Sequence, residues 1–152
     1  VGGAYRKYQA PMGRLIHIGR AAAEAEAAAA LALRGMDRMI AALRPGVTAG
    51  EVYAVWEAVA REGGLADYRR HHCGYLVGVG FPPSWTGGAM VTSLAPNSAR
   101  RLEAGMVFHL QSWFTDTGRG PDFSYFVSNT VLLGETGGEK LTALTPEELI
   151  LR

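Results

Sequence analysis

With 152 residues, of which 48% are hydrophobic and 19% charged, the chain has the composition of one globular domain with a substantial core, which excludes a disordered protein. Its formal net charge of +1 excludes the strongly basic surface of a nucleic-acid-binding protein, so no nucleic-acid partner is expected. Cys73 is the only cysteine, which excludes an internal disulfide and favours a reducing, cytoplasmic location. No apolar stretch is long enough to cross a bilayer, so we expect no membrane partner.

The first predicted elements are strands. Residues 3–18 are rich in Tyr, Ile and Leu and predict two strand segments around a bend at residues 11–13, Pro-Met-Gly. The sequence starts at Val1 without a methionine and already has strand character there. We therefore expect part of a longer protein.

Two helices follow. Residues 20–43 have the high helix propensity of alanine, and one apolar stripe recurs at helical spacing in Leu33, Met36, Ile40 and Leu43. Thr48 and Glu51 have the spacing of a capping box, which predicts the start of a second helix that runs to about Glu62. Its predicted buried side consists of Val52, Val55, Trp56 and Val59. Residues 63–64, Gly-Gly, predict that this helix ends at a glycine in the left-handed backbone conformation.

The last predicted elements form an antiparallel hairpin. Its strands are residues 106–114 and 124–133, with a turn rich in Gly and Asp between them and a further turn at residues 134–141. Strand alternation places His109, Gln111 and Trp113 on one face of the first strand. Helices followed by a hairpin indicate an α+β fold.

The segment before the hairpin carries a resemblance to a known family. Residues 70–85 read RHHCGYLVGVGFPPSW, in which Gly74 and Gly78 match glycines of the Gly-His-Gly-x-Gly-Leu segment of the creatinase/aminopeptidase ("pita-bread") family. Tyr75 occupies the position of the family's metal-binding histidine. Residues 102–111, LEAGMVFHLQ, are similar to the family's Leu-x-x-Gly-Met-Val-Phe-x-Ile-Glu signature, and Gln111 takes the place of a metal-binding glutamate.

Two further segments extend the resemblance over the whole chain. Residues 127–142 are similar to the family's closing strand and its Gly-x-Glu-x-Leu-Thr end, with Ser128 in place of the last metal glutamate. Residues 8–14 resemble Tyr-x-x-Asp-x-Thr-Arg, with Pro11 in place of a metal aspartate. The family's other aspartate would fall just before Val1. Because amide, hydroxyl and proline groups cannot replace carboxylates and imidazole as ligands, we expect no metal and no other cofactor.

The resemblance implies a fold and an assembly. Residues 1–152 would form the C-terminal portion of a pita-bread catalytic domain, two helices packed on a curved antiparallel sheet, without the N-terminal half and the N-terminal domain. The full-length protein would be a homodimer that acts on a small-molecule substrate.

The resemblance also implies a function. Metal-free family members such as creatinase and ectoine hydrolase open C–N bonds of small solutes, and the Gly-Tyr, Pro-Pro-x-Trp and Phe-His-Leu pieces resemble the ectoine hydrolase branch most. The implied function is a metal-independent hydrolase that opens a C–N bond of a small nitrogenous solute such as ectoine. Ser128-Asn129 departs from the Ser-Glu expected in that branch. The alternatives are a metal-dependent Xaa-Pro dipeptidase or aminopeptidase and a catalytically inactive pita-bread binding module.

Three residues are the candidate catalytic groups. Tyr75 would donate a hydrogen bond, His109 would carry protons because its ordinary pKa lies near neutrality, and Gln111 would orient water or substrate. A carboxylate just before Val1 would attack the substrate if the branch resemblance holds. Tyr75 as a core tyrosine and His109 as a buried structural histidine are the plainer alternatives.

Four more residues are candidate substrate contacts: Trp85, Trp113, Ser128 and Asn129. Trp85 would stack on a planar or cationic substrate, and its alternative is a place in a rigid turn. For Ser128 and Asn129 the alternative is packing within the hairpin. Residues 71–73, His-His-Cys, are interpreted as loop structure or a pocket rim, since adjacent residues rarely converge on one ion. Cys73 lacks an arrangement that would activate its thiol.

Overall fold

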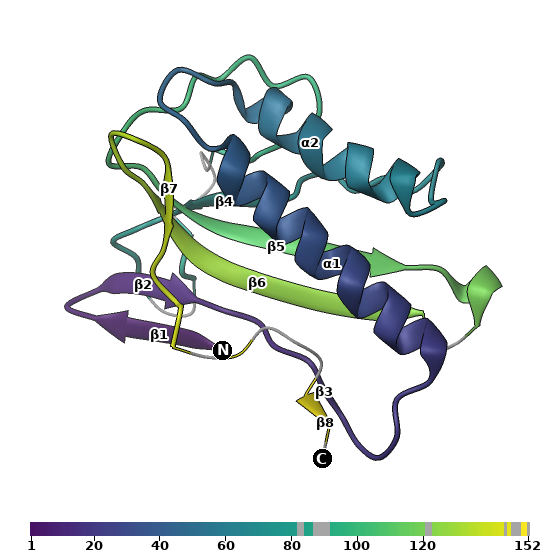
Figure 1. Ribbon diagram of the computed structural model, residues 1–152. Coiled ribbons are helices and arrows are strands. Elements are labelled where there is room, and N and C mark those ends of the chain that lie inside the picture. Colours follow the sequence, from purple (N-terminus) through teal and green to yellow (C-terminus); the bar gives the residue numbers. More distant parts are fainter. Residues whose placement is uncertain (82–83, 87–91, 121–122, 145, 147–149, 152) are drawn as a thin grey trace.

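A computed structural model of the chain describes residues 1–81, 84–86, 92–120, 123–144, 146 and 150–151 (Figure 1). Its elements in chain order are β1 (Gly2–Tyr5), β2 (Tyr8–Pro11), β3 (Ile16–His17), α1 (Ala23–Ala42), α2 (Ala49–Glu62), β4 (Gly74–Val77), β5 (Val107–Thr115), the 3-10 turn η1 (Thr117–Arg119), β6 (Ser124–Leu133), β7 (Gly138–Lys140) and β8 (Ile150–Leu151). Among these described elements, no helix is both long and apolar enough to span a membrane.

The fold has two layers. Strands β4, β5, β6 and β7 form an antiparallel sheet in that order, and α1 and α2 lie across one of its faces (Figure 1). The hairpin of β1 and β2 lies on the other side of the sheet. This arrangement confirms the predicted α+β fold with two helices on an antiparallel sheet, although β7 occupies part of the segment for which only a turn was predicted.

The buried stripe of α1 differs from the predicted one. Met36 and Leu43 are fully buried as predicted, whereas Leu33 and Ile40 are only partly buried. Most of the other buried residues of the helix are small. A Cβ added at Gly35 would lie 2.5 Å from the Ser112 Oγ on β5. The small residues therefore let the helix backbone approach the sheet closely.

Helix α2 is anchored by Trp56. The indole is fully buried and stacks on Phe114 of β5, with ring centroids 5.2 Å apart and an interplanar angle of 7°. Tyr68 packs against both rings from the loop after α2. Val55 is only partly buried, contrary to the prediction, and Tyr53 is buried in the helix face instead. The helix start is as predicted, with both hydrogen bonds of the capping box formed between Thr48 and Glu51.

The amino-terminal hairpin turns at a different place from the predicted bend. Its turn residues are Arg6 and Lys7, with φ of 48° and 71°. The expected bend at residues 11–13 instead runs along β6, where Gly13 and Ser128 exchange two backbone hydrogen bonds of 3.2 and 3.1 Å. A Cβ at Gly13 would overlap the ring of Phe126, so only glycine permits this approach.

We expect Thr48→Ala to lower the free energy of unfolding by about 1 kcal/mol, because it removes the side-chain acceptor for the first turn of α2. Thr48→Ser, which keeps the hydroxyl, is the matched control and should lose much less. Urea denaturation of the three proteins measures the difference. Equal losses in the two variants would contradict a capping role.

Candidate functional site

The sheet face opposite the helices carries the predicted catalytic side chains. The register pairs Tyr75 with His109 and Gln111 with Ser128, and the alternation of strand residues directs all four to the same face. The other face carries the apolar side chains that pack under the helices, among them Phe108, Leu110, Phe114, Val127 and Val131. The sheet therefore separates a core face from a polar face.

A chain of hydrogen bonds joins the side chains of the polar face. The Trp85 indole Nε1 donates to the Tyr75 Oη at 2.9 Å, and that oxygen lies 2.8 Å from the His109 Nδ1. On the other side of the imidazole ring, Nε2 lies 2.8 Å from the Ser128 Oγ. The Gln111 amide nitrogen approaches Nδ1 at 3.4 Å.

The donors around His109 indicate its tautomer. Trp85 can only donate, so Tyr75 accepts from the indole and keeps its own proton for Nδ1. Gln111 Nε2 is a second donor directed at Nδ1. With Nδ1 as acceptor, the imidazole proton lies on Nε2 and is donated to Ser128 Oγ. In this arrangement Ser128 accepts a hydrogen bond from His109 and is not activated as a nucleophile.

His109 is kept neutral by its surroundings. The residue is only 5% exposed. Burial lowers the pKa of His109 to about 4, with a smaller contribution from His72. At neutral pH the imidazole therefore has one lone pair that can take a proton.

His72 lies next to this site, although the sequence predicted only loop structure or a pocket rim for it. Its ring meets Tyr75 edge-on, with centroids 5.4 Å apart, and its Nδ1 is buried with no hydrogen-bond partner in the described part of the chain. Burial, followed by the charges of His71 and Arg70, lowers the pKa of His72 to about 4. The spacing of His72 three residues before Tyr75 was visible in the sequence, but the loop conformation that brings the rings together was not.

The two predicted tryptophans lie at different parts of the polar face. Trp85 is 39% exposed and is tied to Tyr75, while residues 82–83 of the predicted rigid turn lie outside the described residues. Trp113 is 36% exposed, meets Phe126 edge-on across the strands, and has the guanidinium of Arg70 over its ring. Both indoles remain accessible to a small molecule.

Asn129 is not part of the cluster around His109. It faces away from Ser128 in the alternation of β6, and its Oδ1 accepts hydrogen bonds from Arg14 at 2.9 Å and from Thr142 at 2.8 Å. Arg14 also donates to the Ser128 carbonyl oxygen at 2.8 Å. These contacts favour the packing interpretation of Asn129 and the site interpretation of Ser128.

Cys73 lies directly before β4, and its side chain is not accessible to solvent. It is fully buried, its Sγ donates to the Leu94 carbonyl oxygen at 3.6 Å, and burial raises the pKa of the thiol. A thiol in such surroundings is a poor nucleophile.

A cavity of about 510 Å³ adjoins the site between the β1–β2 hairpin and the sheet. Its lining includes Tyr5, Tyr8, Val107 and Thr130, and Thr130 is the strand partner of His109. Cavities of this size accommodate small organic molecules.

The side chains at the expected metal positions do not fit a metal centre. Tyr75, Gln111 and Ser128 supply neutral oxygen and nitrogen atoms, and Pro11 supplies no side-chain donor. In the ranges that the structure describes, no three His, Cys, Asp or Glu side chains gather into a possible metal site.

Comparisons with known proteins agree with the resemblance seen in the sequence. Ectoine hydrolase of Halomonas elongata is 29% identical over 154 aligned residues, which cover all of this chain and 36% of that protein. Agropine synthesis cyclase of Rhizobium rhizogenes is 35% identical over 112 residues, 74% of this chain and 26% of that protein. The chain thus spans little more than a third of the longer-matching relative.

The fold comparison gives the same result. The crystal structure of an X-Pro aminopeptidase from Thermotoga maritima matches with a TM-score of 0.84 at 22% identity, covering 99% of this chain and 40% of that one. This likeness confirms the expected partial pita-bread fold. The family model described as "Metallopeptidase family M24" matches residues 1–135, and the chain therefore belongs to that family.

Proposed function

We propose that the protein is a hydrolase that opens a C–N bond of a small nitrogenous solute without a metal ion, with ectoine as the leading substrate. The observation that carries the proposal is the neutral hydrogen-bonded chain of Trp85, Tyr75, His109 and Ser128. In this chain Tyr75 and Ser128 stand at positions where the family resemblance implies metal ligands. Such a chain can move protons and donate hydrogen bonds but cannot hold a divalent ion.

The proposed reaction uses each group of the chain. Water, oriented by the Gln111 amide, adds through its oxygen to the carbon of the C–N bond and gives a proton to the neutral His109. Tyr75 gives its phenolic proton to the leaving nitrogen as the C–N bond breaks, and His109 returns a proton to Tyr75. The 2.8 Å separation of Tyr75 Oη and His109 Nδ1 suits this last transfer.

The relatives support a small-molecule substrate. The likeness to ectoine hydrolase extends over all of this chain, and the name of the second relative, a cyclase, also denotes chemistry other than peptide cleavage.

A metal-dependent Xaa-Pro peptidase is the second candidate. The family description and the fold of the Thermotoga maritima aminopeptidase favour it. The donor set of Tyr75, Gln111 and Ser128 opposes it, because a dinuclear centre needs anionic oxygen ligands.

We expect the full-length protein to hydrolyse ectoine equally well with and without a chelator such as EDTA, since no step needs a metal. Mass spectrometry of the product, with a Xaa-Pro dipeptide as the parallel substrate, measures this. Loss of turnover in chelator, or cleavage of the dipeptide alone, would contradict the proposal. Silence on both substrates would also reject ectoine and would favour the inactive binding module.

Tyr75→Phe should lower kcat by roughly 10²-fold, because it removes the only phenolic proton in the chain of hydrogen bonds. Tyr68→Phe is the matched control, since Tyr68 packs against Trp56 and Phe114 on the helix side of the sheet. Steady-state kinetics with ectoine, together with thermal unfolding, separates loss of catalysis from loss of folding. A Tyr75→Phe enzyme with unchanged kcat would remove Tyr75 from the mechanism.

The lowered pKa values of His109 and His72 should make stability depend on pH. Unfolding restores an ordinary value near 6.5. Between pH 5 and 6.5 the unfolded chain therefore binds more protons, and the free energy of unfolding falls as the pH is lowered. His109→Gln should flatten this slope by about half, one of two such histidines being removed. Urea titrations at several pH values test this, and an unaltered slope in His109→Gln would show that His109 is not held neutral.

A further inference from the structure

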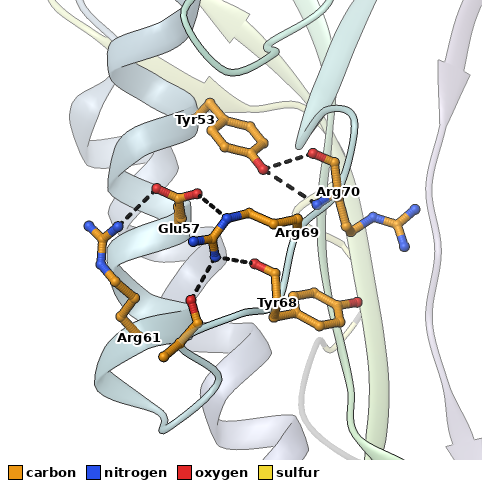
Figure 2. Close-up of polar contacts among 7 residues, drawn as sticks. Tyr53, Glu57, Arg61, Tyr68, Arg69 and Arg70 are labelled. Atoms are coloured by element: carbon orange, nitrogen blue, oxygen red, sulfur yellow. Dashed lines mark hydrogen bonds and ion pairs between the residues drawn. The ribbon is translucent and has the colours of Figure 1, made fainter.

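The side chains of the neighbouring residues Arg69 and Arg70, in the loop after α2, point in different directions (Figure 2). The Arg69 guanidinium lies against α2, 3.3 Å from a Glu57 oxygen, and donates to the carbonyl oxygens of Ala66 and Tyr68. The Arg70 side chain points away from this cluster in Figure 2. The Arg69 guanidinium is thus bound by groups of the protein around α2, whereas the Arg70 guanidinium lies outside this cluster.

The backbone of Arg70 is held firmly. The Tyr53 hydroxyl donates to the Arg70 carbonyl oxygen at 2.7 Å and accepts from the Arg70 amide at 3.4 Å (Figure 2). Tyr53 is itself buried in α2. This pair of bonds fixes where the Arg70 side chain leaves the loop.

The Arg70 guanidinium makes a cation–π contact on the site side of the sheet. Its central carbon lies 4.2 Å from the centroid of a Trp113 ring, and Trp113 is braced by Phe126. In the described part of the chain the guanidinium has no ion pair and no hydrogen bond. A cation–π contact uses none of the guanidinium N–H groups as a hydrogen-bond donor, so these groups stay available.

The position of Trp113 brings this free charge to the candidate site. Trp113 shares the face of β5 with Gln111 and His109, and a two-residue step along a strand is about 7 Å. Strands β4, β5 and β6, which carry the candidate site, contain no aspartate or glutamate to balance the charge: β4 reads GYLV, β5 VFHLQSWFT and β6 SYFVSNTVLL. A cation held in place beside neutral groups suits an anionic part of a ligand.

We propose that Arg70 binds a carboxylate of the substrate, so that the protein acts on small nitrogenous solutes that carry a carboxylate. This inference rests on the proposed function for the identity of the site. The carboxylate would sit at the Trp113 end of the polar face, with the reacting bond beside Gln111 and His109. Trp113 acts through Arg70 as a positioning residue, and lysine at position 70 would lack the fixed fork of N–H donors that matches a carboxylate.

The test compares Arg70→Gln with Arg69→Gln as the matched control. Kinetics with ectoine should show KM raised roughly 10–100-fold in Arg70→Gln, with kcat changed little, because a charge-assisted hydrogen bond is lost on binding. Arg69→Gln should keep the KM of the wild-type protein. Equal KM values in the two variants, with turnover intact, would overturn the role of Arg70 and leave the proposed function standing.

A second measurement does not depend on ectoine turnover. The full-length protein is titrated with N-acetylglycine and with N-acetylglycinamide, which differ only in the carboxylate, and the Trp113 indole N–H resonance is followed by NMR. The wild-type protein and Arg69→Gln should respond to the carboxylate much more strongly than to the amide, and Arg70→Gln should show no such preference. A preference that requires Arg70 in a protein inert toward ectoine would sink the proposed substrate but keep the carboxylate site. Absence of any preference in the wild-type protein would overturn the site.

Discussion

The alternation of side chains along β5, fixed by its pairing with β4 and β6, is the constraint on which the rest of the molecule depends. Odd-numbered positions carry His109, Gln111 and Trp113, and even-numbered positions carry the apolar residues under the helices. A shift of one residue would bury polar groups under α1 and expose Phe108 and Phe114. Core packing and site geometry are therefore determined by the same register.

Neutrality is the second feature that runs through the site. His109 is buried without a charged partner, and a buried imidazolium there would be costly, which is why the pKa falls. The hydrogen bonds from Tyr75 and to Ser128 satisfy both ring nitrogens of the neutral form. In a buried site the effective dielectric constant is low, so such hydrogen bonds reinforce one another. An ion that enters the site therefore interacts strongly with any fixed charge. The placement of Arg70 at the rim rather than inside the cluster is consistent with this balance.

Local patterns in the sequence predicted much of the fold. The capping box at Thr48, the two long strands and the shared face of His109 and Gln111 depend on neighbours within a few residues, and they are present in the structure. The turn at Arg6 and Lys7 was missed because such turns usually carry Asn or Gly at left-handed positions. The buried face of α1 was predicted only in part, at Met36 and Leu43, because large apolar residues were weighted above the alanines that fit a close contact.

The parts of the site that sequence could not supply are those that join distant segments. Ser128 and Asn129 were equivalent candidates in sequence, and only the strand register and the bonds of Arg14 separate them. The orientation of Arg70 likewise follows from its backbone bonds to Tyr53, seventeen residues earlier in the chain. No pattern in the sequence distinguishes Arg69 from Arg70. Their side chains point in different directions because of the conformation of the loop after α2.

The burial of Cys73 has a practical consequence. This sole cysteine precedes β4, and its backbone joins Leu94 on one side and Gln111 on the other. A thiol reagent can reach it only when these contacts open, so the labelling rate under native conditions measures the free energy of that local opening. The chain thus contains a natural chemical reporter of breathing motions at the edge of its candidate site, and ligand binding there would register as slower alkylation.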